Sequence, residues 1–359
     1  AQKVQITGDF LPTKQIDTPV GKYDAPGVAD LVKDDKGVWS FTSTNLSPEL
    51  YSYNLLLDGV KIVDPGSVYI TRDITSVTNI FILSDKKGDC GDLYTVNEVP
   101  HGNVQKVWYD SPTLKMQRRM TVYTPAGYDK GKDYPVLYLL HGAGGDEDAW
   151  TTLGRASQIL DNLIATGKAK PMVVVMTNGN PNCQAAPGEW SAGMYVPSFY
   201  GYQGAKAVAT MDESFPDVMN YVESHYKVGK DKAHRAICGL SMGGGHSFDI
   251  SRRFPNKFDY VGLFSAGLHV GKTGDFRTDF YKMLQEDEEA KQQLATLFKN
   301  KPKLYWIGMG KTDFLYKSTA GLRRYFDEKG YKYTYMETEG GHIWRNWRVY
   351  LTEFAQKIF

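Results

Sequence analysis

The alternation of strand-like and helix-like segments after residue 101 is the feature that most constrains the fold of this chain. Short apolar runs, suited to buried strands, stand at 136–140, 172–176, 235–238, 260–265, 304–309 and 332–337. Segments with helical periodicity separate these runs. The alternation predicts an α/β domain with a doubly wound, mostly parallel sheet covered by helices on both faces. Ligands of such sheets bind beyond the carboxyl ends of the strands, so functional residues are expected there.

The first 90 residues follow a different pattern, in which strand-sized runs alternate with turn signals. An alternating run at 51–55 leads directly into Asp58-Gly59. An Asp-Gly pair between two such runs indicates a β-hairpin, because both central residues of a type I′ turn need positive φ. We therefore predict three parts, an all-β, immunoglobulin-like sandwich over 1–90, a linker over the polar and aperiodic stretch 91–100, and the α/β domain over 101–359.

Charge and composition exclude several classes of protein. The chain carries 42 Lys and Arg against 41 Asp and Glu, whereas binding to nucleic acid or to an anionic membrane needs a clustered excess of cations. No apolar run approaches the ~18 residues of a membrane-spanning helix. Cys90, Cys183 and Cys238 are too scattered for a disulfide framework or a zinc site, so we expect no metal and no cofactor. Unpaired thiols are favoured, although Cys90 and Cys183 could pair in an oxidising compartment. The oligomeric state stays open.

A Gly-x-Ser-x-Gly sequence at 239–243 lies between a strand-like run and a helix-like segment. A serine on such a sharp turn projects its hydroxyl above the sheet, near a helix N-terminus that favours developing negative charge. We predict Ser241 as a nucleophile and the Met242 N–H as one donor to an oxyanion. The alternative is an ordinary serine in a glycine-rich turn. Ser191 and Ser265 lack the full spacing and are interpreted as structural.

A nucleophilic serine needs an adjacent base, which a third group orients. His342 follows the strand-like run 332–337 and precedes the last helix-like segment, so it is the predicted base. Asp313 follows the run 304–309 and comes between Ser241 and His342 in the chain, as expected of the orienting acid. The alternative for Asp313 is that it only caps the next turn.

The loop that begins at His141 directly follows the strand-like run 136–140. An oxyanion loop has this position in hydrolases with a strand–turn–helix nucleophile, and its histidine usually has a structural part. We predict the Ala143 N–H as the second oxyanion donor, with Gly144 as the alternative. His246 is expected on the helix after Ser241, in a packed position.

The N-terminal part resembles the early-set sandwich related to family 48 carbohydrate-binding modules. The resemblance rests on Gly8-Asp9-Phe10, Gly37-Val38-Trp39-Ser40, Tyr51-Ser52-Tyr53 and Asp58-Gly59 with Asp64-Pro65. It implies a module that either binds glycan or packs over an active site. Trp39 lies inside a strand-like run and is more compatible with the core than with a sugar platform.

The remainder of the chain resembles the esterase D and family 1 carbohydrate esterase group of α/β-hydrolases, which includes feruloyl and acetylxylan esterases. Four motifs carry the resemblance, namely Leu-Leu-His-Gly-Ala-Gly-Gly-Asp-Glu at 139–147 with Trp150, Gly-Leu-Ser-Met-Gly-Gly at 239–244, Gly308-x-Gly310-x-x-Asp313, and Gly341-His342-x-Trp344-x-x-Trp347-Arg348. The resemblance implies a serine esterase that removes ferulate or related hydroxycinnamoyl groups from plant cell-wall (arabino)xylan through an acyl-enzyme. It also implies a secreted or periplasmic bacterial protein with its signal peptide already removed, in line with a first residue Ala1 rather than Met.

The substrate side of the site is predicted from aromatic residues near the expected loops. Trp150, Trp190 and Trp344, together with Gly144, are predicted to contact substrate, because flat rings hold a phenolic ring or stack on sugars. Trp347 is instead expected to wedge the last helix against the sheet. The segment 181–204 is too long for a simple turn and is expected to form a pocket wall.

The expected partner is feruloylated or acetylated xylan or xylo-oligosaccharide. Three alternatives stay open. The first is an acetylxylan esterase on the same scaffold. The second is a peptidase, which usually carries a propeller in front rather than a small sandwich. The third is a non-catalytic glycan-binding protein, against which the complete set of candidate triad residues argues.

Overall fold

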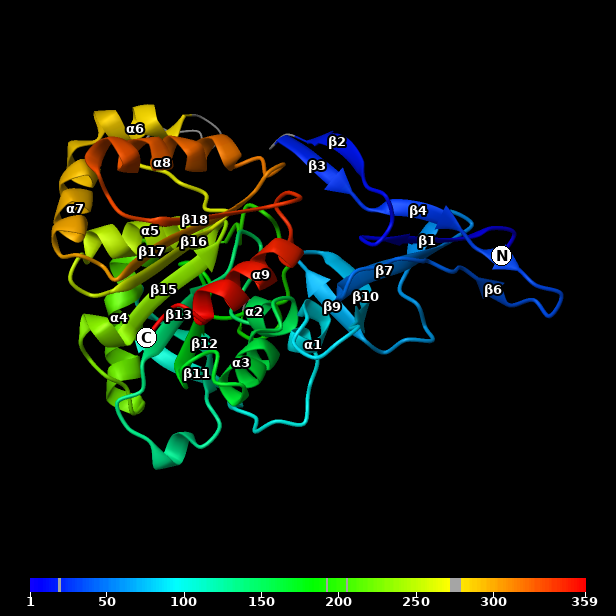
Figure 1. The fold of residues 1–359 in the computed structure, drawn as a ribbon, viewed down its shortest axis with the longest axis horizontal. Coiled ribbons are helices and arrows are strands. Elements are labelled where there is room, and N and C mark those ends of the chain that lie inside the picture. Colours follow the sequence, from blue (N-terminus) through cyan, green and yellow to red (C-terminus); the bar gives the residue numbers. More distant parts are fainter. Residues whose placement is uncertain (19–20, 192, 205, 272–278) are drawn as a thin grey trace. The chain divides into compact units, whose positions relative to one another are not determined.

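The computed structural model describes residues 1–359 except 19–20, 192, 205 and 272–278 (Figure 1). The chain divides into two units, Ala1–Glu98 and Val99–Phe359. None of the helices in the described part combines the length and the apolar character that a membrane crossing requires.

Antiparallel strands build the first unit. Six of them form one sheet in the order β4-β1-β7-β10-β9, with β8 paired to β7. Its strands are β1 (Val4–Gly8), β4 (Gly27–Asp30), β7 (Glu49–Leu57), β8 (Val60–Ile62), β9 (Ile70–Asp73) and β10 (Ser76–Leu83). Two further pairs are β2 (Lys14–Thr18) with β3 (Gly21–Ala25), and β5 (Val32–Lys33) with β6 (Trp39–Ser40). The predicted all-β character of this region is confirmed, whereas a glycan-binding role stays a prediction.

The predicted hairpin at Asp58-Gly59 is present between β7 and β8. Asp58 has φ of 48° and Gly59 has φ of 88°, as a type I′ turn requires. The turn brings Leu57 opposite Val60. Nearer the start of β7, the Tyr51 ring packs against Phe81 of β10 at a centroid distance of 5.3 Å. Local turn chemistry therefore sets the register of this part of the sheet.

The stretch 91–100, predicted as a linker, contains structure. Helix α1 (Cys90–Tyr94) starts at Asp89, whose side chain accepts a hydrogen bond from the Asp92 N–H. The helix packs against β7 and β10, and the Tyr94 side chain is buried. A helix of five residues is too short to show periodicity, so the sequence pattern did not indicate it. The boundary between the units lies after Glu98.

One eight-stranded sheet organises the second unit, in the order β11-β12-β14-β13-β15-β16-β17-β18. The strands from β13 and β14 through β18 pair in parallel, and β11 and β12 add an antiparallel edge. The bounds are β11 (Asn103–Ser111), β12 (Met116–Thr124), β13 (Val136–Leu140), β14 (Val173–Thr177), β15 (Arg235–Leu240), β16 (Tyr260–Phe264), β17 (Leu304–Gly310) and β18 (Thr334–Thr338). The predicted mostly parallel α/β fold is confirmed. The edge strand β11 is largely exposed and polar, which hid the β11–β12 pair from the sequence pattern.

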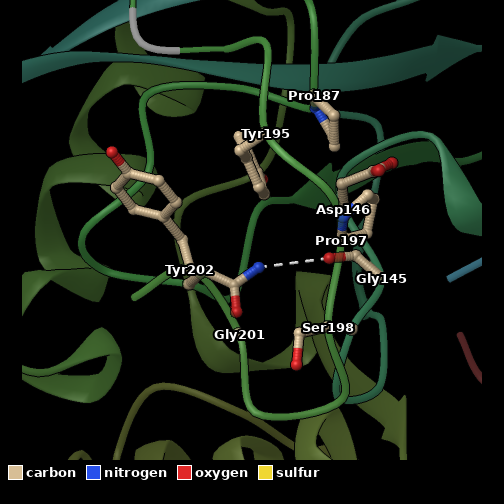
Figure 2. Close-up of a pocket in the computed structure, with 10 residues that line it drawn as sticks. Gly145, Asp146, Pro187, Tyr195, Pro197, Ser198, Gly201 and Tyr202 are labelled. Atoms are coloured by element: carbon tan, nitrogen blue, oxygen red, sulfur yellow. Dashed lines mark hydrogen bonds between the residues drawn. The ribbon is translucent and has the colours of Figure 1, made fainter. Parts of the chain in front are cut away.

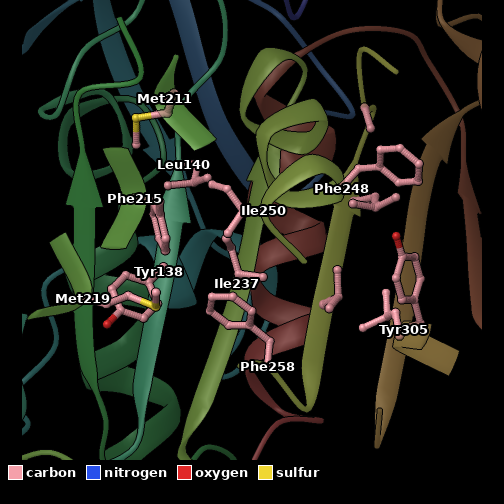
Figure 3. Packing of buried hydrophobic residues seen from close by; sticks show 14 of the residues in the cluster. Tyr138, Leu140, Met211, Phe215, Met219, Ile237, Phe248, Ile250, Phe258 and Tyr305 are labelled. Carbon is pink, nitrogen blue, oxygen red and sulfur yellow. The ribbon is translucent and has the colours of Figure 1, made fainter. Parts of the chain in front are cut away.

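Helices cover both faces of this sheet. They are α2 (Ala149–Thr152), α3 (Ala156–Ala165), α4 (Met211–His225), α5 (Met242–Arg253), α6 (Phe280–Glu286), α7 (Glu288–Lys299), α8 (Tyr316–Lys329) and α9 (Trp344–Ala355). On one face, Tyr138 of β13 packs against Phe215 of α4 and lies near Ile237 of β15 (Figure 3). On the other face, Trp306 of β17 packs against Tyr350 of α9. Each large apolar side chain buried in these layers contributes about 1.5–3 kcal/mol.

Candidate active site

Ser241 stands on the turn between β15 and α5. Its backbone has φ of 51° and ψ of −115°, outside the regions that most residues adopt. A Cβ on Gly239 would lie 2.5 Å from the Gly243 carbonyl carbon, and one on Gly243 would lie 2.5 Å from the carbonyl oxygens of Leu140 and His141. Both flanking positions therefore exclude side chains, which explains the Gly-x-Ser-x-Gly spacing.

Backbone hydrogen bonds hold the strained turn in place. The Ser241 N–H donates to the Phe264 carbonyl at 2.8 Å. The Ser241 carbonyl accepts from the Gly267 N–H at 2.8 Å and from the Gly245 N–H at 3.0 Å. Because the turn is hydrogen-bonded to the neighbouring strand β16 as well as to its own helix, the backbone position from which the Ser241 side chain projects is fixed.

The two predicted oxyanion donors, the N–H groups of Met242 and Ala143, belong to the start of α5 and to the loop after β13. Met242 is the first residue of α5, so its N–H has no acceptor within the helix and lies at the positive end of the helix dipole. Ala143 belongs to the loop after β13, and a Cβ on its neighbour Gly142 would lie 3.2 Å from the Ser241 Cβ. The loop thus runs directly beside the Ser241 turn.

His141 holds this loop through both ring nitrogens. Its Nδ1 lies 2.7 Å from the Gly142 carbonyl oxygen, and its Nε2 accepts a hydrogen bond from the Gly179 N–H at 2.7 Å. The ring is therefore neutral, with the hydrogen on Nδ1. Burial lowers the pKa of His141, which keeps it neutral. His141 thus has a structural position rather than that of a base.

Asp313 and His342 are in contact at the carboxyl ends of β17 and β18. His342 Nδ1 lies 2.9 Å from Asp313 Oδ2 and 3.1 Å from Oδ1. Asp313 Oδ1 also accepts a hydrogen bond from the Leu315 N–H at 2.9 Å. Burial alone would raise the pKa of Asp313, but the His342 charge and these hydrogen bonds outweigh burial and lower it. An ionised carboxylate only accepts, so Nδ1 carries a hydrogen, and in the neutral imidazole Nε2 is left as an acceptor.

Aromatic rings fix the orientation of His342. The Phe314 ring lies at a centroid distance of 4.5 Å from the imidazole, and the Trp347 ring meets it edge-on at 4.9 Å. Trp347 is buried on α9, as expected for a residue that wedges this helix against the sheet. The contact with His342 was not predicted, and a Trp five residues after a candidate histidine is the signal that could have indicated it.

The three predicted triad residues share one edge of the sheet. Ser241 follows β15, Asp313 follows β17 and His342 follows β18, and these strands are parallel neighbours with only β16 between β15 and β17. The structure brings Asp313 and His342 into contact, on the side of the sheet edge where the Ser241 turn lies.

A pocket adjoins the loop after β13 (Figure 2). Gly144, which was predicted to contact substrate, lies in its wall. The pocket is lined by Gly144, Gly145, Asp146, Asn180, Pro187, Tyr195, Pro197, Ser198, Gly201 and Tyr202. Residues of the segment 181–204 form most of one wall, so the sequence located this wall while leaving Asp146 and Asn180 unidentified.

The tryptophans predicted to contact substrate do not line this pocket. Trp150 is only 1% exposed, and its Nε1 donates to the Leu140 carbonyl at 2.9 Å, so the prediction of substrate contact is wrong for Trp150. Trp344 is half-buried and packs edge-on against Trp150 at 5.3 Å. Trp190 packs its ring edge-on against Tyr202, which lines the pocket, at 5.3 Å. Trp150 and Trp344 thus pack against each other and do not line this pocket.

Cysteines and metal-binding groups can be placed as well. Cys183 and Cys238 are buried free thiols. Across the described ranges 1–18, 21–191, 193–204, 206–271 and 279–359, no group of three or more His, Cys, Asp or Glu could hold a metal ion.

A serine on a strained strand–helix turn, with an Asp–His pair at the same edge of a parallel sheet, defines the α/β-hydrolase class. The Esterase family model, described as putative esterase, matches residues 111–358 of this chain, so the chain belongs to the Esterase family.

Named relatives and solved structures are similar to this chain. An endo-1,4-β-xylanase/feruloyl esterase of Xylanibacter ruminicola is 32% identical over 340 residues, which cover 92% of this chain and 41% of the relative. A ferulic acid esterase structure is 26% identical, with a TM-score of 0.57, and covers 73% of this chain and 100% of its own. A CE1 ferulic acid esterase of Anaeromyces mucronatus is 25% identical, with a TM-score of 0.55, over 75% of this chain and 96% of its own. This chain spans less than half the length of the curated relatives it matches first.

Proposed function

We propose that this protein is a serine esterase that hydrolyses ferulate or related hydroxycinnamate esters on plant cell-wall (arabino)xylan. The observation that carries the proposal is the buried contact of 2.9 Å between Asp313 and His342, at the sheet edge where the Ser241 turn lies. The ferulate substrate is supported by the names of the xylanase/feruloyl esterase relative and of the two ferulic acid esterase structures.

In the first half of the proposed reaction, Ser241 Oγ attacks the carbonyl carbon of the ester. His342 Nε2 takes the serine proton, and Asp313 stabilises the imidazolium that forms. The Met242 and Ala143 N–H groups donate to the oxyanion of the tetrahedral intermediate, each for about 3 kcal/mol of transition-state stabilisation. His342 then returns the proton to the departing sugar oxygen, which leaves the acyl group on Ser241.

Water completes the cycle. His342 Nε2 takes a proton from a water molecule, whose oxygen attacks the acyl carbon and forms a second oxyanion in the same position. Collapse of this intermediate breaks the bond to Ser241 Oγ, and His342 returns the proton to that oxygen. The products are ferulate and the free sugar hydroxyl, and the residues named above supply every proton transfer.

The alternative acyl group, acetate, is less well supported. The three related proteins reported above are named for feruloyl or ferulic acid esters. A rate comparison on methyl ferulate, acetylated xylan and p-nitrophenyl acetate tests the proposal. We expect turnover of methyl ferulate and p-nitrophenyl acetate that Ser241→Ala abolishes. A wild-type enzyme that cleaves acetylated xylan while leaving methyl ferulate intact would overturn it.

We also propose that the enzyme acts outside the cytoplasm, because a feruloylated xylan polymer or a large xylo-oligosaccharide is too large to reach a cytoplasmic enzyme. Fractionation of the producing cells checks this proposal. Methyl ferulate hydrolysis should appear in the medium or the periplasmic fraction, and activity confined to the cytoplasmic fraction would contradict it.

A further inference from the structure

The pocket beside the Gly144 loop has two walls that come from distant parts of the chain. The turn at Gly144–Asp146 forms one wall, and the segment after β14 forms the other. Asn180 joins them, because its side-chain Nδ2 donates to the Gly145 carbonyl at 3.1 Å (Figure 2). The distance between the walls thus depends on what holds Asn180.

Asn178 holds Asn180. The Asn178 Oδ1 atom accepts from the Asn180 backbone N–H at 2.9 Å and from the Asn180 side-chain Nδ2 at 3.1 Å. The other end of the same side chain, Nδ2, donates to Glu147 Oε2 at 2.9 Å. Asn178 is therefore oriented at one end by Asn180 and at the other by Glu147.

Glu147 is the centre of this arrangement. It has 0% exposure, and its Oε1 accepts from the Arg119 Nε at 2.6 Å and from the Ala186 backbone N–H at 2.9 Å. A continuous chain of hydrogen bonds runs from Arg119 through Glu147, Asn178 and Asn180 to the Gly145 carbonyl. A buried carboxylate is costly unless it is paired and fully hydrogen-bonded, so the geometry around Glu147 is strongly determined.

Arg119 anchors the chain of hydrogen bonds on β12. Its guanidinium also pairs with Asp148 at 3.0 Å and with Glu189 at 2.8 Å. The Glu189 side chain is 54% exposed, and it lies outside the chain of bonds that ends at Gly145. Exposed ion pairs contribute little, so Glu189 serves as a matched comparison for the buried Glu147.

Other residues hold the neighbouring backbone independently of Glu147. Arg118 Nη2 donates to the carbonyls of Asn178 and Asn180 at 2.7 Å each. His141 holds the inner part of the loop after β13 through Gly142 and Gly179. A change at Glu147 should therefore leave the oxyanion donors and the fold in place while it loosens the pocket walls.

We propose that Glu147 is a positioning residue that sets the spacing of the two pocket walls, and that this spacing selects for a bulky aromatic acyl group over acetyl. The inference rests on the proposed feruloyl esterase function. Glu147 acts through Asn178 and Asn180 and does not touch the reacting atoms. Its removal should change the binding of a bulky acyl group more than the chemical step.

The test compares Glu147→Gln with Glu189→Gln on methyl ferulate and p-nitrophenyl acetate. For Glu147→Gln we expect KM for methyl ferulate to rise ~10-fold while kcat/KM for p-nitrophenyl acetate changes less than ~3-fold, because misplaced walls affect only the group they contact. For Glu189→Gln we expect both substrates within ~2-fold of wild type. Titration with a fluorophosphonate probe gives the fraction of active enzyme in each preparation.

A second variant covers the case that Glu147→Gln does not fold. Asn178→Ala breaks the link between Glu147 and Asn180 without changing a residue that lines the pocket, and Glu147 stays paired with Arg119. We expect it to raise KM for methyl ferulate with p-nitrophenyl acetate hydrolysis retained. An equal loss on both substrates, or no change in either folded variant, overturns the inference. A wild-type enzyme that is inactive on methyl ferulate but active on p-nitrophenyl acetate overturns the proposed function itself, and the inference with it.

Discussion

The two sides of the candidate active site are built differently. On one side, Asp313 and His342 follow the ends of neighbouring parallel strands and meet directly, with Phe314 and Trp347 packed around the imidazole. On the other side, the pocket walls are loops that a chain of long-range hydrogen bonds through Glu147 holds together. The first side takes its geometry from the sheet, and the second depends on side chains far apart in the sequence. We therefore expect changes on the first side to affect all substrates equally and changes on the second to affect substrate choice.

The largest effect is expected for Ser241→Ala. Removal of the nucleophile should lower kcat by about 10⁶ on every ester, since the triad acts as a unit. Alanine experiences the same backbone strain as serine at φ of 51°, so the fold should persist. Single-turnover assays on p-nitrophenyl acetate measure the effect. Substantial turnover by this variant would show that Ser241 is not the nucleophile.

Asp313→Asn should have the next largest effect, a decrease of about 10⁴ in kcat, because the amide no longer holds His342 in the required tautomer. The same factor is expected for methyl ferulate and for p-nitrophenyl acetate. The ratio of the two rates in the variant, relative to wild type, therefore measures whether this side of the site affects all substrates equally. A near-normal rate would show that another carboxylate orients His342. A substrate-dependent loss would contradict the division between the two sides.

His141→Gln tests the point at which the two sides meet. The change removes the ring that joins Gly142 to Gly179, so the Ala143 donor should move away from the oxyanion. We expect a decrease of about 10² in kcat on both substrates, the size of a lost oxyanion donor. Steady-state kinetics with active-site titration measures it. A loss of activity restricted to methyl ferulate would show that His141 positions the pocket walls rather than the oxyanion donor.

The smallest effect concerns acid stability. The pKa of Asp313 in the folded protein lies below its ordinary value of 3.8. Its ionised form therefore contributes stability above that pH, and the contribution is lost as pH falls through the folded pKa. Thermal midpoints of wild type and Asp313→Asn, measured from about pH 6 to about pH 3, should converge as the pH decreases. The Ser241→Ala variant keeps the Asp313 carboxylate, so its thermal midpoint should change with pH as that of wild type does. A difference between the midpoints of wild type and Asp313→Asn that stays constant with pH would argue against the linkage.

Local sequence patterns indicated much of the fold and the candidate residues on the strand ends. The Gly-x-Ser-x-Gly turn, Asp313 after β17 and His342 after β18 are each visible within a few residues of a strand-like run. Strand ends are predictable because burial on both faces gives the parallel strands continuous apolar runs. The exposed edge strand β11 and the five-residue helix α1 have no such signal.

Contacts between distant residues could not be predicted in this way. Trp150 follows an oxyanion-type loop in the sequence, which suggested a substrate contact, but its Nε1 is satisfied by the Leu140 carbonyl inside the core. Likewise, Arg119 and Glu147 are 28 residues apart, and no local pattern pairs them. A tryptophan or an ion pair can serve either the core or the site, and only the packing around it decides between them.

The sequence by itself determined the alternation of strands and helices, the serine turn and the order of serine, acid and histidine, because these depend on local backbone and burial preferences. The tertiary structure decided which aromatic rings face the pocket, how His342 is oriented and how Glu147 connects the pocket walls. Those features depend on side-chain contacts between elements that only the folded chain brings together.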